Sequence, residues 1–493
     1  MSQSRREFLT NAAGGAAATF LATGAGLQRV WAQPRSSLEP LPTVSGPVTG
    51  GLRGHIFAGF SGDIGAHGYV EQEFFVEGVA LNYRPVGTLG PDGNWTTQPG
   101  TTAPFKTRVI VQRPRDPRRF NGIVLCEWIN VSAGYEISMA PRGFLNAGFA
   151  FAAISAQKVG LEGYPPERNL GLKRWDARRY GSLHSPGDSY SYDIFSQVAR
   201  ALGPNRSRRG VDPMGGLSVR HLVAVGESQS AARVASYANG VDHHARVFDA
   251  ILPVVSTGSL TTFDDFDFDP NLSLAENTAR RRNATFRARI RDQLRVPVVV
   301  LNSETETPIY VASRRPDGPN FRYWEFAGAV HASAVGGGRL PETAQRDGTP
   351  QHEWPKMVDL MPSIEAAAAG AVRWRRGGAP VSSQARVDID TSAATPTIRQ
   401  DENGNARGGV RLPEIEVPVA TYVTQTRTAG GRFEPFSAEK LRRLYPTDAI
   451  YLQRVTAAAR RAEREGLILP YRTAQYIAEA RQGPLRVAQS LAS

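Results

Sequence analysis

The stretch HLVAVGESQSAARVASY, from His221 to Tyr237, decides the fold. It opens with an apolar run, turns sharply at Gly226, and continues with residues that fit a helix. A strand, a tight turn with a central serine and a helix form a nucleophile elbow. The pattern predicts that Ser228 Oγ stands above a sheet edge and that the Gln229 N–H faces an incoming carbonyl oxygen. Ser230 stands near where a second glycine is more usual, and a lone G-x-S-x-S segment also fits an ordinary strand–helix junction, so the rest of the chain has to decide.

Further apolar runs predict the other strands of the sheet. They alternate with helical patterns such as the one over 188–202, which indicates right-handed crossovers and a mostly parallel central sheet with helices on both faces. The fold class is therefore α/β, and ligands of such sheets bind at the carboxyl ends of the strands. The predicted strands lie at 107–111, 122–128, 149–154, 222–225, 247–255, 296–301 and 322–327.

The mature chain, residues 33–493, is expected to form a single domain. Residues 33–105 are rich in glycine, proline and short strand patterns, and predict a β-rich N-terminal extension. The segment 256–294 interrupts the strand–helix alternation; it predicts either a cap over the site or a solvent-facing excursion. A C-terminal extension, 377–493, contains helical pieces whose apolar positions need burial, so we expect it to pack on the core.

A serine hydroxyl needs a base to take its proton and an acid to orient that base, in the chain order Ser, Asp/Glu, His. Downstream of Ser228, His331 follows the last predicted strand, where the base belongs. His352 lies in a polar loop and is the weaker candidate. His243 and His244 lie between the elbow helix and the next strand, which is the wrong place. We therefore expect His331 to be the base.

Two carboxylates follow the 296–301 run, in the turn Asn-Ser-Glu-Thr-Glu. The acid of this architecture comes at the end of that turn, which favours Glu306, with Glu304 a close second. One of them orients His331 while the other caps a helix or braces the loop. The paired carboxylate would stabilise the imidazolium as Ser228 attacks.

The second oxyanion donor should come from the loop after the 122–128 strand. The candidates, beside Gln229, are backbone N–H groups of Trp128, Ile129 and Asn130. Gln157 and Lys158, after the next strand, are further candidates for lining the pocket. The Trp128 side chain fits either the wall of the pocket or the core.

The N-terminus is typical of an export signal. Residues 4–9 read SRREFL, a weakly apolar run occupies 12–27, and Val-Trp-Ala at 30–32 offers a cleavage site. We expect residues 1–32 to be a twin-arginine signal peptide, read by the twin-arginine export machinery and removed, with a periplasmic or secreted product. The glycine-broken apolar run is too short to span a bilayer comfortably, so no stable membrane span is expected.

Charge and composition exclude several classes of protein. The formal net charge of the chain is +12, and removal of three arginines and one glutamate with residues 1–32 leaves 12 − 3 + 1 = +10. The basic clusters at 113–119 and 280–291 hold only one aromatic residue, Phe286, which disfavours nucleic-acid binding. No H-E-x-x-H, paired cysteine, P-loop or dinucleotide motif is present, so neither a metal nor a cofactor is expected. The single cysteine, Cys126, lies in an apolar run and reads as inert core.

Several of these segments resemble one bacterial family, exported proteins described only as an alpha/beta hydrolase domain. The matching pieces are FNGIVLCEWINVS (120–132), RYGSLHSPGDSYSYDIFSQVARAL (179–202), VGESQSA (225–231), VPVVVLNSETE (296–306), FRYWEFAGAVHA (321–332) and NARGGVRLPEIEVP (405–418). The resemblance spans most of the mature chain and implies an α/β-hydrolase fold that includes the tail. It also implies Ser228 as nucleophile, His331 as base and an acid from the SETE turn, and it names no substrate.

The sequence thus predicts an exported serine hydrolase that acts on a small-molecule carboxylic ester through an acyl-enzyme. One alternative is an amide hydrolase with the same triad. The other is a non-catalytic binding protein that kept the fold, because a fold does not fix a function.

Overall fold

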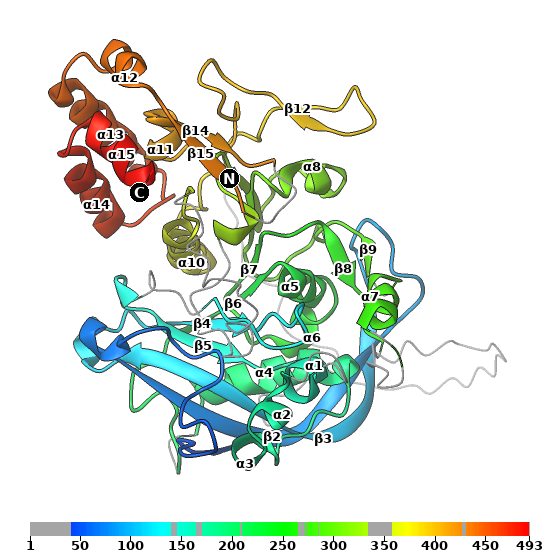
Figure 1. Cartoon of the computed structure of the whole chain (residues 1–493). Coiled ribbons are helices and arrows are strands. Elements are labelled where there is room, and N and C mark those ends of the chain that lie inside the picture. Colours follow the sequence, from blue (N-terminus) through cyan, green and yellow to red (C-terminus); the bar gives the residue numbers. More distant parts are fainter. Residues whose placement is uncertain are drawn as a thin grey trace, which may run out of the picture. The chain divides into compact units, whose positions relative to one another are not determined.

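A sheet of nine strands carries the fold in the part of the chain that the computed structural model describes (Figure 1). That part comprises residues 41–139, 145–163, 170–207, 210–264, 272, 274–283, 285–333, 357–425 and 430–492. All of these residues belong to one compact unit.

The strands of the sheet follow the order β1, β2, β3, β5, β4, β6, β7, β10, β11. The pairs from β1 to β5 are antiparallel, and those from β5 to β11 are parallel. The bounds are β1 (Thr43–Ser45), β2 (Tyr69–Pro85), β3 (Thr97–Pro114), β4 (Ile123–Trp128), β5 (Ala150–Ile154), β6 (His221–Glu227), β7 (Ala250–Val254), β10 (Val298–Ser303) and β11 (Phe321–Phe326).

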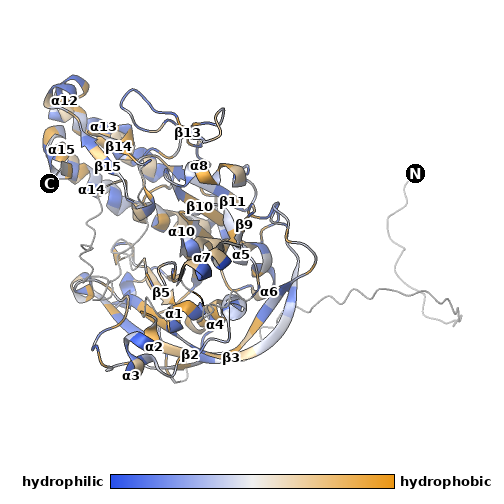
Figure 2. Ribbon diagram, turned by 45° about the vertical axis from the view of Figure 1, so that its right-hand side comes forward, coloured by the Kyte–Doolittle hydropathy of each residue, from blue (hydrophilic) through white to orange (hydrophobic). Residues whose placement is uncertain are grey.

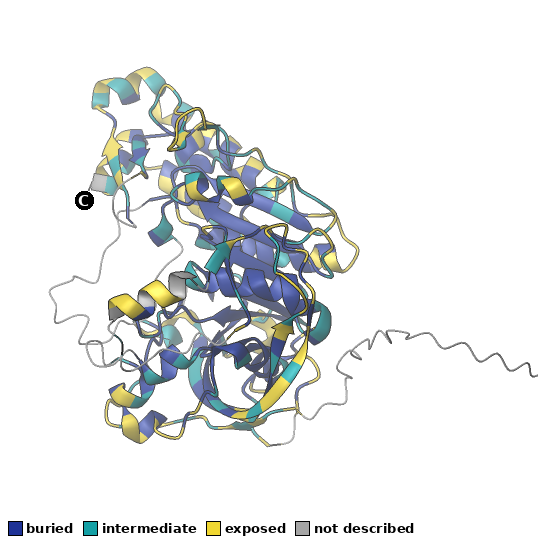
Figure 3. Cartoon of the chain, turned by 90° about the vertical axis from the view of Figure 1, so that its right-hand side faces the viewer, coloured by how far each residue is buried: buried dark blue, intermediate teal, exposed yellow. Residues whose placement is uncertain are grey.

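The predicted parallel strands are confirmed, with shifts of a few residues at their ends. The residues of β4, β5, β7 and β10 are all buried, because helices cover both faces of a parallel sheet (Figure 3). The long hairpin of β2 and β3 instead mixes hydrophilic and hydrophobic residues, and part of each strand is exposed (Figure 2). The N-terminal extension thereby becomes the antiparallel end of the same sheet.

Helices and short strands fill the connections. The helices are α1 (Lys158–Glu162), α2 (Leu172–Trp175), α3 (Ala177–Tyr180), α4 (Ser191–Leu202), α5 (Gln229–Gly240), α6 (Asp242–Ala245), α7 (Leu274–Asn283), α8 (Thr307–Tyr310), α10 (Met361–Arg375), α11 (Pro413–Glu416), α12 (Ala438–Leu444), α13 (Asp448–Arg464), α14 (Pro470–Ala480) and α15 (Pro484–Ala492). The small hairpins pair β8 (Ser259–Thr261) with β9 (Thr285–Arg287), β12 (Ile389–Asp390) with β13 (Thr397–Ile398), and β14 (Ala420–Val423) with β15 (Arg432–Pro435).

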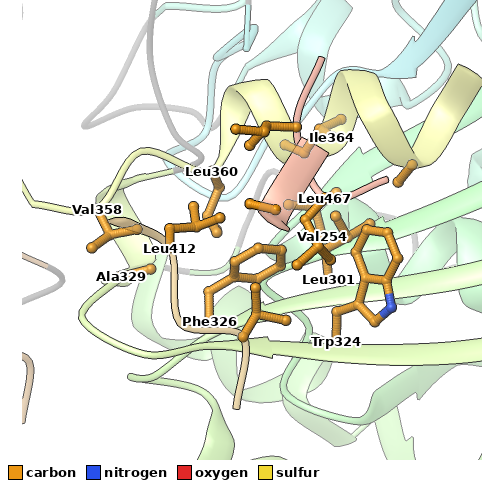
Figure 4. Close-up of a cluster of buried hydrophobic side chains, with 14 of the residues drawn as sticks. Val254, Leu301, Trp324, Phe326, Ala329, Val358, Leu360, Ile364, Leu412 and Leu467 are labelled. Carbon is orange, nitrogen blue, oxygen red and sulfur yellow. The ribbon is translucent and has the colours of Figure 1, made fainter. Parts of the chain in front are cut away.

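Each face of the sheet packs into its own hydrophobic core. Along β6, Val223 and Val225 point to the core that contains α10, whereas Leu222 and Ala224 point to the core that contains α4 and α5. The C-terminal residues Leu412 and Leu467 share the first core with Val254, Leu301 and Trp324 (Figure 4). The tail therefore buries its apolar positions against the sheet that carries the site.

A buried ion network ties the N-terminal hairpin to the rest of the sheet. The Arg108 guanidinium of β3 donates to Glu73 of β2 at 2.8 Å and also to Glu136. Glu73 in turn accepts from Arg179 at 2.7 Å and from the Tyr180 hydroxyl at 2.9 Å. Such charges are tolerated in the interior only when each is paired, so the network fixes the 136 and 179 segments relative to the hairpin.

The predicted cap segment, 256–294, is fastened to the elbow helix where it begins. Ser236 of α5 accepts from the Thr261 N–H at 2.9 Å and donates to the Thr261 carbonyl at 2.8 Å. Residues 265–271 lie outside the described part, and gating by this segment stays a prediction. Among the described residues, no helix is both long and apolar enough to cross a bilayer.

Candidate active site

Ser228 lies in the turn between β6 and α5, as the sequence predicted. Its backbone has φ 54° and ψ −113°, a region that residues other than glycine rarely occupy. The Ser228 N–H donates to the Val254 carbonyl at the end of β7, at 3.0 Å. Strain of this kind persists only where the surroundings hold it, and it is typical of functional sites.

The small residues on either side of Ser228 make the turn possible. A Cβ atom on Gly226 would lie 2.5 Å from the Ser230 carbonyl oxygen, so only glycine fits there. Ser230 accepts a hydrogen bond from the Glu227 N–H at 3.0 Å and donates one to the Glu227 carbonyl at 2.9 Å. Serine therefore stabilises the turn at a position where a second glycine is usual.

His331 and Glu306 meet at the carboxyl ends of the last two strands. His331 Nδ1 lies 2.6 Å from Glu306 Oε1, and Ser303 Oγ donates to the other carboxylate oxygen of Glu306. The Glu306 side chain is 3 % exposed and that of His331 is 22 % exposed. A proton on Nδ1 faces the carboxylate in this arrangement, which leaves Nε2 as the ring nitrogen free to act as a base.

The elbow and the His331–Glu306 pair are connected through the sheet. The Ser228 N–H is bonded to the end of β7, and the Val255 N–H that follows β7 donates to Leu301 of β10 at 2.8 Å. Within the described residues no hydrogen bond joins Ser228 Oγ to His331. Catalytic hydrogen bonds are often long without substrate and shorten in the complex. The assignment of Ser228 and His331 to one triad thus stays a prediction.

Glu304 braces the loop that carries His331. Its carboxylate accepts from the Gly328 N–H at 2.6 Å and from the Thr424 hydroxyl at 2.6 Å, and its own N–H donates to the Ala329 carbonyl at 3.0 Å. Burial raises the pKa of Glu304 to about 7. Of the two carboxylates that the sequence left open, Glu306 contacts the imidazole, whereas Glu304 connects its loop to the C-terminal tail.

The loop after β4 differs from the expectation for the second oxyanion donor. The Ile129 N–H donates to the Ile154 carbonyl at 3.2 Å, so it is part of the sheet and not free for an oxyanion. The Asn130 side chain donates to the Glu227 carbonyl at 3.1 Å, and its backbone carbonyl accepts from the Ile137 N–H at 2.8 Å, so the Asn130 N–H stays a candidate donor. The Gln229 N–H stands at the first turn of α5, where helix N–H groups lack helical acceptors.

A hydrogen-bond chain fixes the Gln229 side chain beside the nucleophile. Gln229 accepts from the Val131 N–H at 3.3 Å and donates to Gln157 Oε1 at 2.9 Å. Gln157 donates to Asp188 at 2.9 Å, and Asp188 also accepts from Arg233 at 2.9 Å. A carboxylate can only accept, so Asp188 orients the Gln157 amide, which in turn orients the Gln229 amide. The bond from Val131 to Gln229 then holds the loop after β4 against the first turn of α5.

Trp128, left open between wall and core, is a core residue. Its side chain is fully buried, packs against Phe195 and donates to Gln157 at 3.0 Å. The backbone N–H of Lys158 donates to Asp188 at 3.0 Å, on the same chain of polar contacts. Gln157 is therefore connected to the site by the hydrogen bond that it accepts from Gln229.

Two buried carboxyl groups near the elbow, those of Glu227 and Glu127, were not predicted from the sequence. Glu227 precedes the nucleophile, and in the described residues neither of its carboxyl oxygens has a hydrogen-bond partner. Burial, and then the nearby Glu127, hold its pKa well above the usual range. Burial likewise raises the pKa of Glu127, which accepts from Ser138 and from the Met139 N–H, to about 8. The available signal was an acidic residue in or at the end of an otherwise apolar run, IVLCEW for Glu127 and LVAVGE for Glu227.

The remaining histidine candidates do not reach this site. His244 of α6 contacts the Thr97 carbonyl at 2.9 Å, and His243 packs against the His244 ring. His352 lies outside the described residues.

The chain belongs to the alpha/beta hydrolase domain family, whose model matches residues 44–478. No curated protein matches the sequence. Among solved structures it is similar to a glucuronoyl esterase from Solibacter usitatus, with 11 % identity, coverage of 60 % of this chain and 82 % of that chain, and a TM-score of 0.27. It is also similar to Est1E from Butyrivibrio proteoclasticus, with 9 % identity, coverage of 50 % of this chain and 88 % of that chain, and a TM-score of 0.23. A third similar structure is dipeptidyl peptidase 4 from Porphyromonas gingivalis, with 12 % identity, coverage of 49 % of this chain and 33 % of that chain, and a TM-score of 0.25. The chain thus covers about a third of the peptidase, and such scores assign no activity to it.

The raised pKa of Glu304 predicts a pH-dependent stability. Between its ordinary value of 4.5 and about 7, the folded chain keeps a proton that the unfolded chain loses, so the free energy of unfolding falls as the pH rises. The pH-dependent contribution of Glu304 to the free energy of unfolding amounts to about 3 kcal/mol at most. Glu304→Gln should remove it, while the exposed control Glu434→Gln should not. Urea unfolding at several pH values measures both slopes, and an unchanged slope in Glu304→Gln would contradict the assignment.

Proposed function

We propose that the protein is a serine hydrolase that cleaves carboxylic esters. The observation that carries the proposal is the short contact between His331 Nδ1 and the buried Glu306 carboxylate, at the same edge of the parallel sheet as the strained elbow serine. An imidazole fixed through Nδ1 presents Nε2 for proton transfer. The order Ser228, Glu306, His331 along the chain is the order of this architecture.

In the proposed mechanism Ser228 Oγ attacks the ester carbonyl while His331 Nε2 takes its proton. Glu306 stabilises the imidazolium that forms. The Gln229 N–H donates to the developing oxyanion; one such donor stabilises the transition state by about 3 kcal/mol. His331 then protonates the leaving alkoxide, and an acyl-enzyme remains on Ser228. Water, activated by His331, releases the acid and restores the serine.

The buried carboxyls around the site support this assignment of charges. Glu127 and Glu227 favour the neutral form because burial raises their pKa values, so they add little negative charge beneath the nucleophile. Glu306 is then the carboxylate that contacts the imidazole and balances the imidazolium.

Covalent labelling tests the nucleophile. A fluorophosphonate probe should label the intact protein and fail to label Ser228→Ala or His331→Ala, because the first lacks the nucleophile and the second lacks its base. Ser132→Ala, a change in the nearby loop after β4, is the matched control and should label like the intact protein. Equal labelling of Ser228→Ala would remove the assignment.

Two isosteric substitutions separate the acids. Glu306→Gln should lower kcat on a chromogenic short-chain ester about a thousandfold, because an amide cannot stabilise the imidazolium. Glu304→Gln should change kcat by less than about tenfold, because a neutral side chain resembles the protonated form that burial favours. Steady-state kinetics of both variants decide the matter, and a larger loss in Glu304→Gln would reverse the roles.

We further propose that the enzyme acts in the periplasm or outside the cell. The support is the sequence alone, the paired Arg5 and Arg6 ahead of a weakly apolar run. Replacement of both arginines by lysine should leave the chain inside the cytoplasm, because the twin-arginine pathway reads that pair. Fractionation of expressing cells measures this, and unchanged export of the double variant would refute the route.

A further inference from the structure

A cavity of about 470 Å³ lies in the C-terminal part of the chain. Its walls come from α11, α13, α14, α15 and the strand β14, which gather at one end of the described chain (Figure 1). Neither Ser228 nor His331 lines it. The volume falls in the range of small-molecule sites, and most of the wall is aliphatic or aromatic.

The charged residues of this cavity are mostly acidic. Asp359, Glu414 and Glu479 line it together with one guanidinium, that of Arg472. Arg472 lies 3.4 Å from Glu414 and 3.6 Å from Glu479. The formal sum is −3 + 1 = −2 in a chain whose net charge is +12. Desolvation by burial raises the pKa of Glu479, and the nearby Arg472 guanidinium opposes that rise.

Three tyrosines complete the wall. Tyr422, Tyr451 and Tyr476 are all buried, with 3 to 5 % of each exposed. The Tyr476 hydroxyl lies 2.7 and 2.8 Å from the two Glu414 oxygens. Burial raises the pKa values of Tyr422 and Tyr451, and the negative charge of Glu414 adds to both shifts. In the described residues, neither of those two hydroxyls makes a hydrogen bond.

This combination suits one ligand chemistry. Aromatic rings attract a cation through their quadrupole, carboxylates supply the opposite charge, and an aliphatic wall accommodates an apolar substituent. We propose that the C-terminal cavity binds an organic cation, an ammonium group with an apolar substituent, at a site separate from the nucleophile. An anionic ligand would meet three carboxylates against one guanidinium, that of Arg472, which already contacts Glu414, Glu479 and the Tyr476 ring.

Calorimetric titration of the full-length protein with two ammonium probes tests the proposal. Choline and benzyltrimethylammonium should both bind, and choline should bind at least about tenfold more tightly than dimethylbutanol, its neutral carbon isostere, because only the cation interacts with the rings and carboxylates. Equal affinity for choline and the neutral isostere, or no heat from either cation at millimolar concentration, would overturn the proposal.

Variants locate the binding and separate it from catalysis. Glu479→Gln should weaken cation binding several-fold, and Glu439→Gln, an exposed glutamate on α12 that does not line the cavity, should leave it unchanged. Ser228→Ala should bind as the intact protein does, so loss of hydrolysis and loss of cation binding are independent results. Binding that disappears in Ser228→Ala, or that survives unchanged in Glu479→Gln, would place the cation elsewhere.

Discussion

The hydrogen bond between His331 and Glu306 is the interaction on which the proposed site depends. It joins a residue that follows β11 to the turn that follows β10, and it is short because both strands end at the same edge of a parallel sheet. Without it the imidazole would have neither a fixed tautomer nor a partner for its positive charge. Glu304, two residues earlier, holds the same loop through the Gly328 N–H and extends the support to Thr424 in the tail.

The buried acidic side chains around the site differ in the groups that each one contacts. Glu306 faces an imidazole, whereas Glu304 accepts from a backbone N–H and a hydroxyl. Glu127 and Glu227 lie where burial favours the proton. Asp188 is paired with Arg233 and orients Gln157. Each environment sets the charge of its carboxyl, so residues of the same type carry different roles within one site.

Much of this arrangement could be predicted from the sequence because it follows from local pattern. Apolar runs gave the parallel strands, and the elbow followed from Gly226 and Ser228. The sequence favoured Glu306 over Glu304 only narrowly, because the choice depends on the path of a turn in which the two residues are two positions apart. The Ile129 N–H was misassigned because its acceptor, Ile154, lies on another strand. The chain from Gln229 through Gln157 to Asp188 joins segments distant in sequence, which no local pattern reveals.

The proposed triad requires Ser228, His331 and Glu306 to act together on one carbonyl group. A crystal structure of the protein after reaction with a phosphonate ester inhibitor tests this directly. We predict a covalent bond from phosphorus to Ser228 Oγ, with His331 Nε2 within hydrogen-bond reach of an oxygen on that phosphorus and Nδ1 still on Glu306. A phosphonyl group on another residue, or an imidazole turned away from the adduct, would contradict the account.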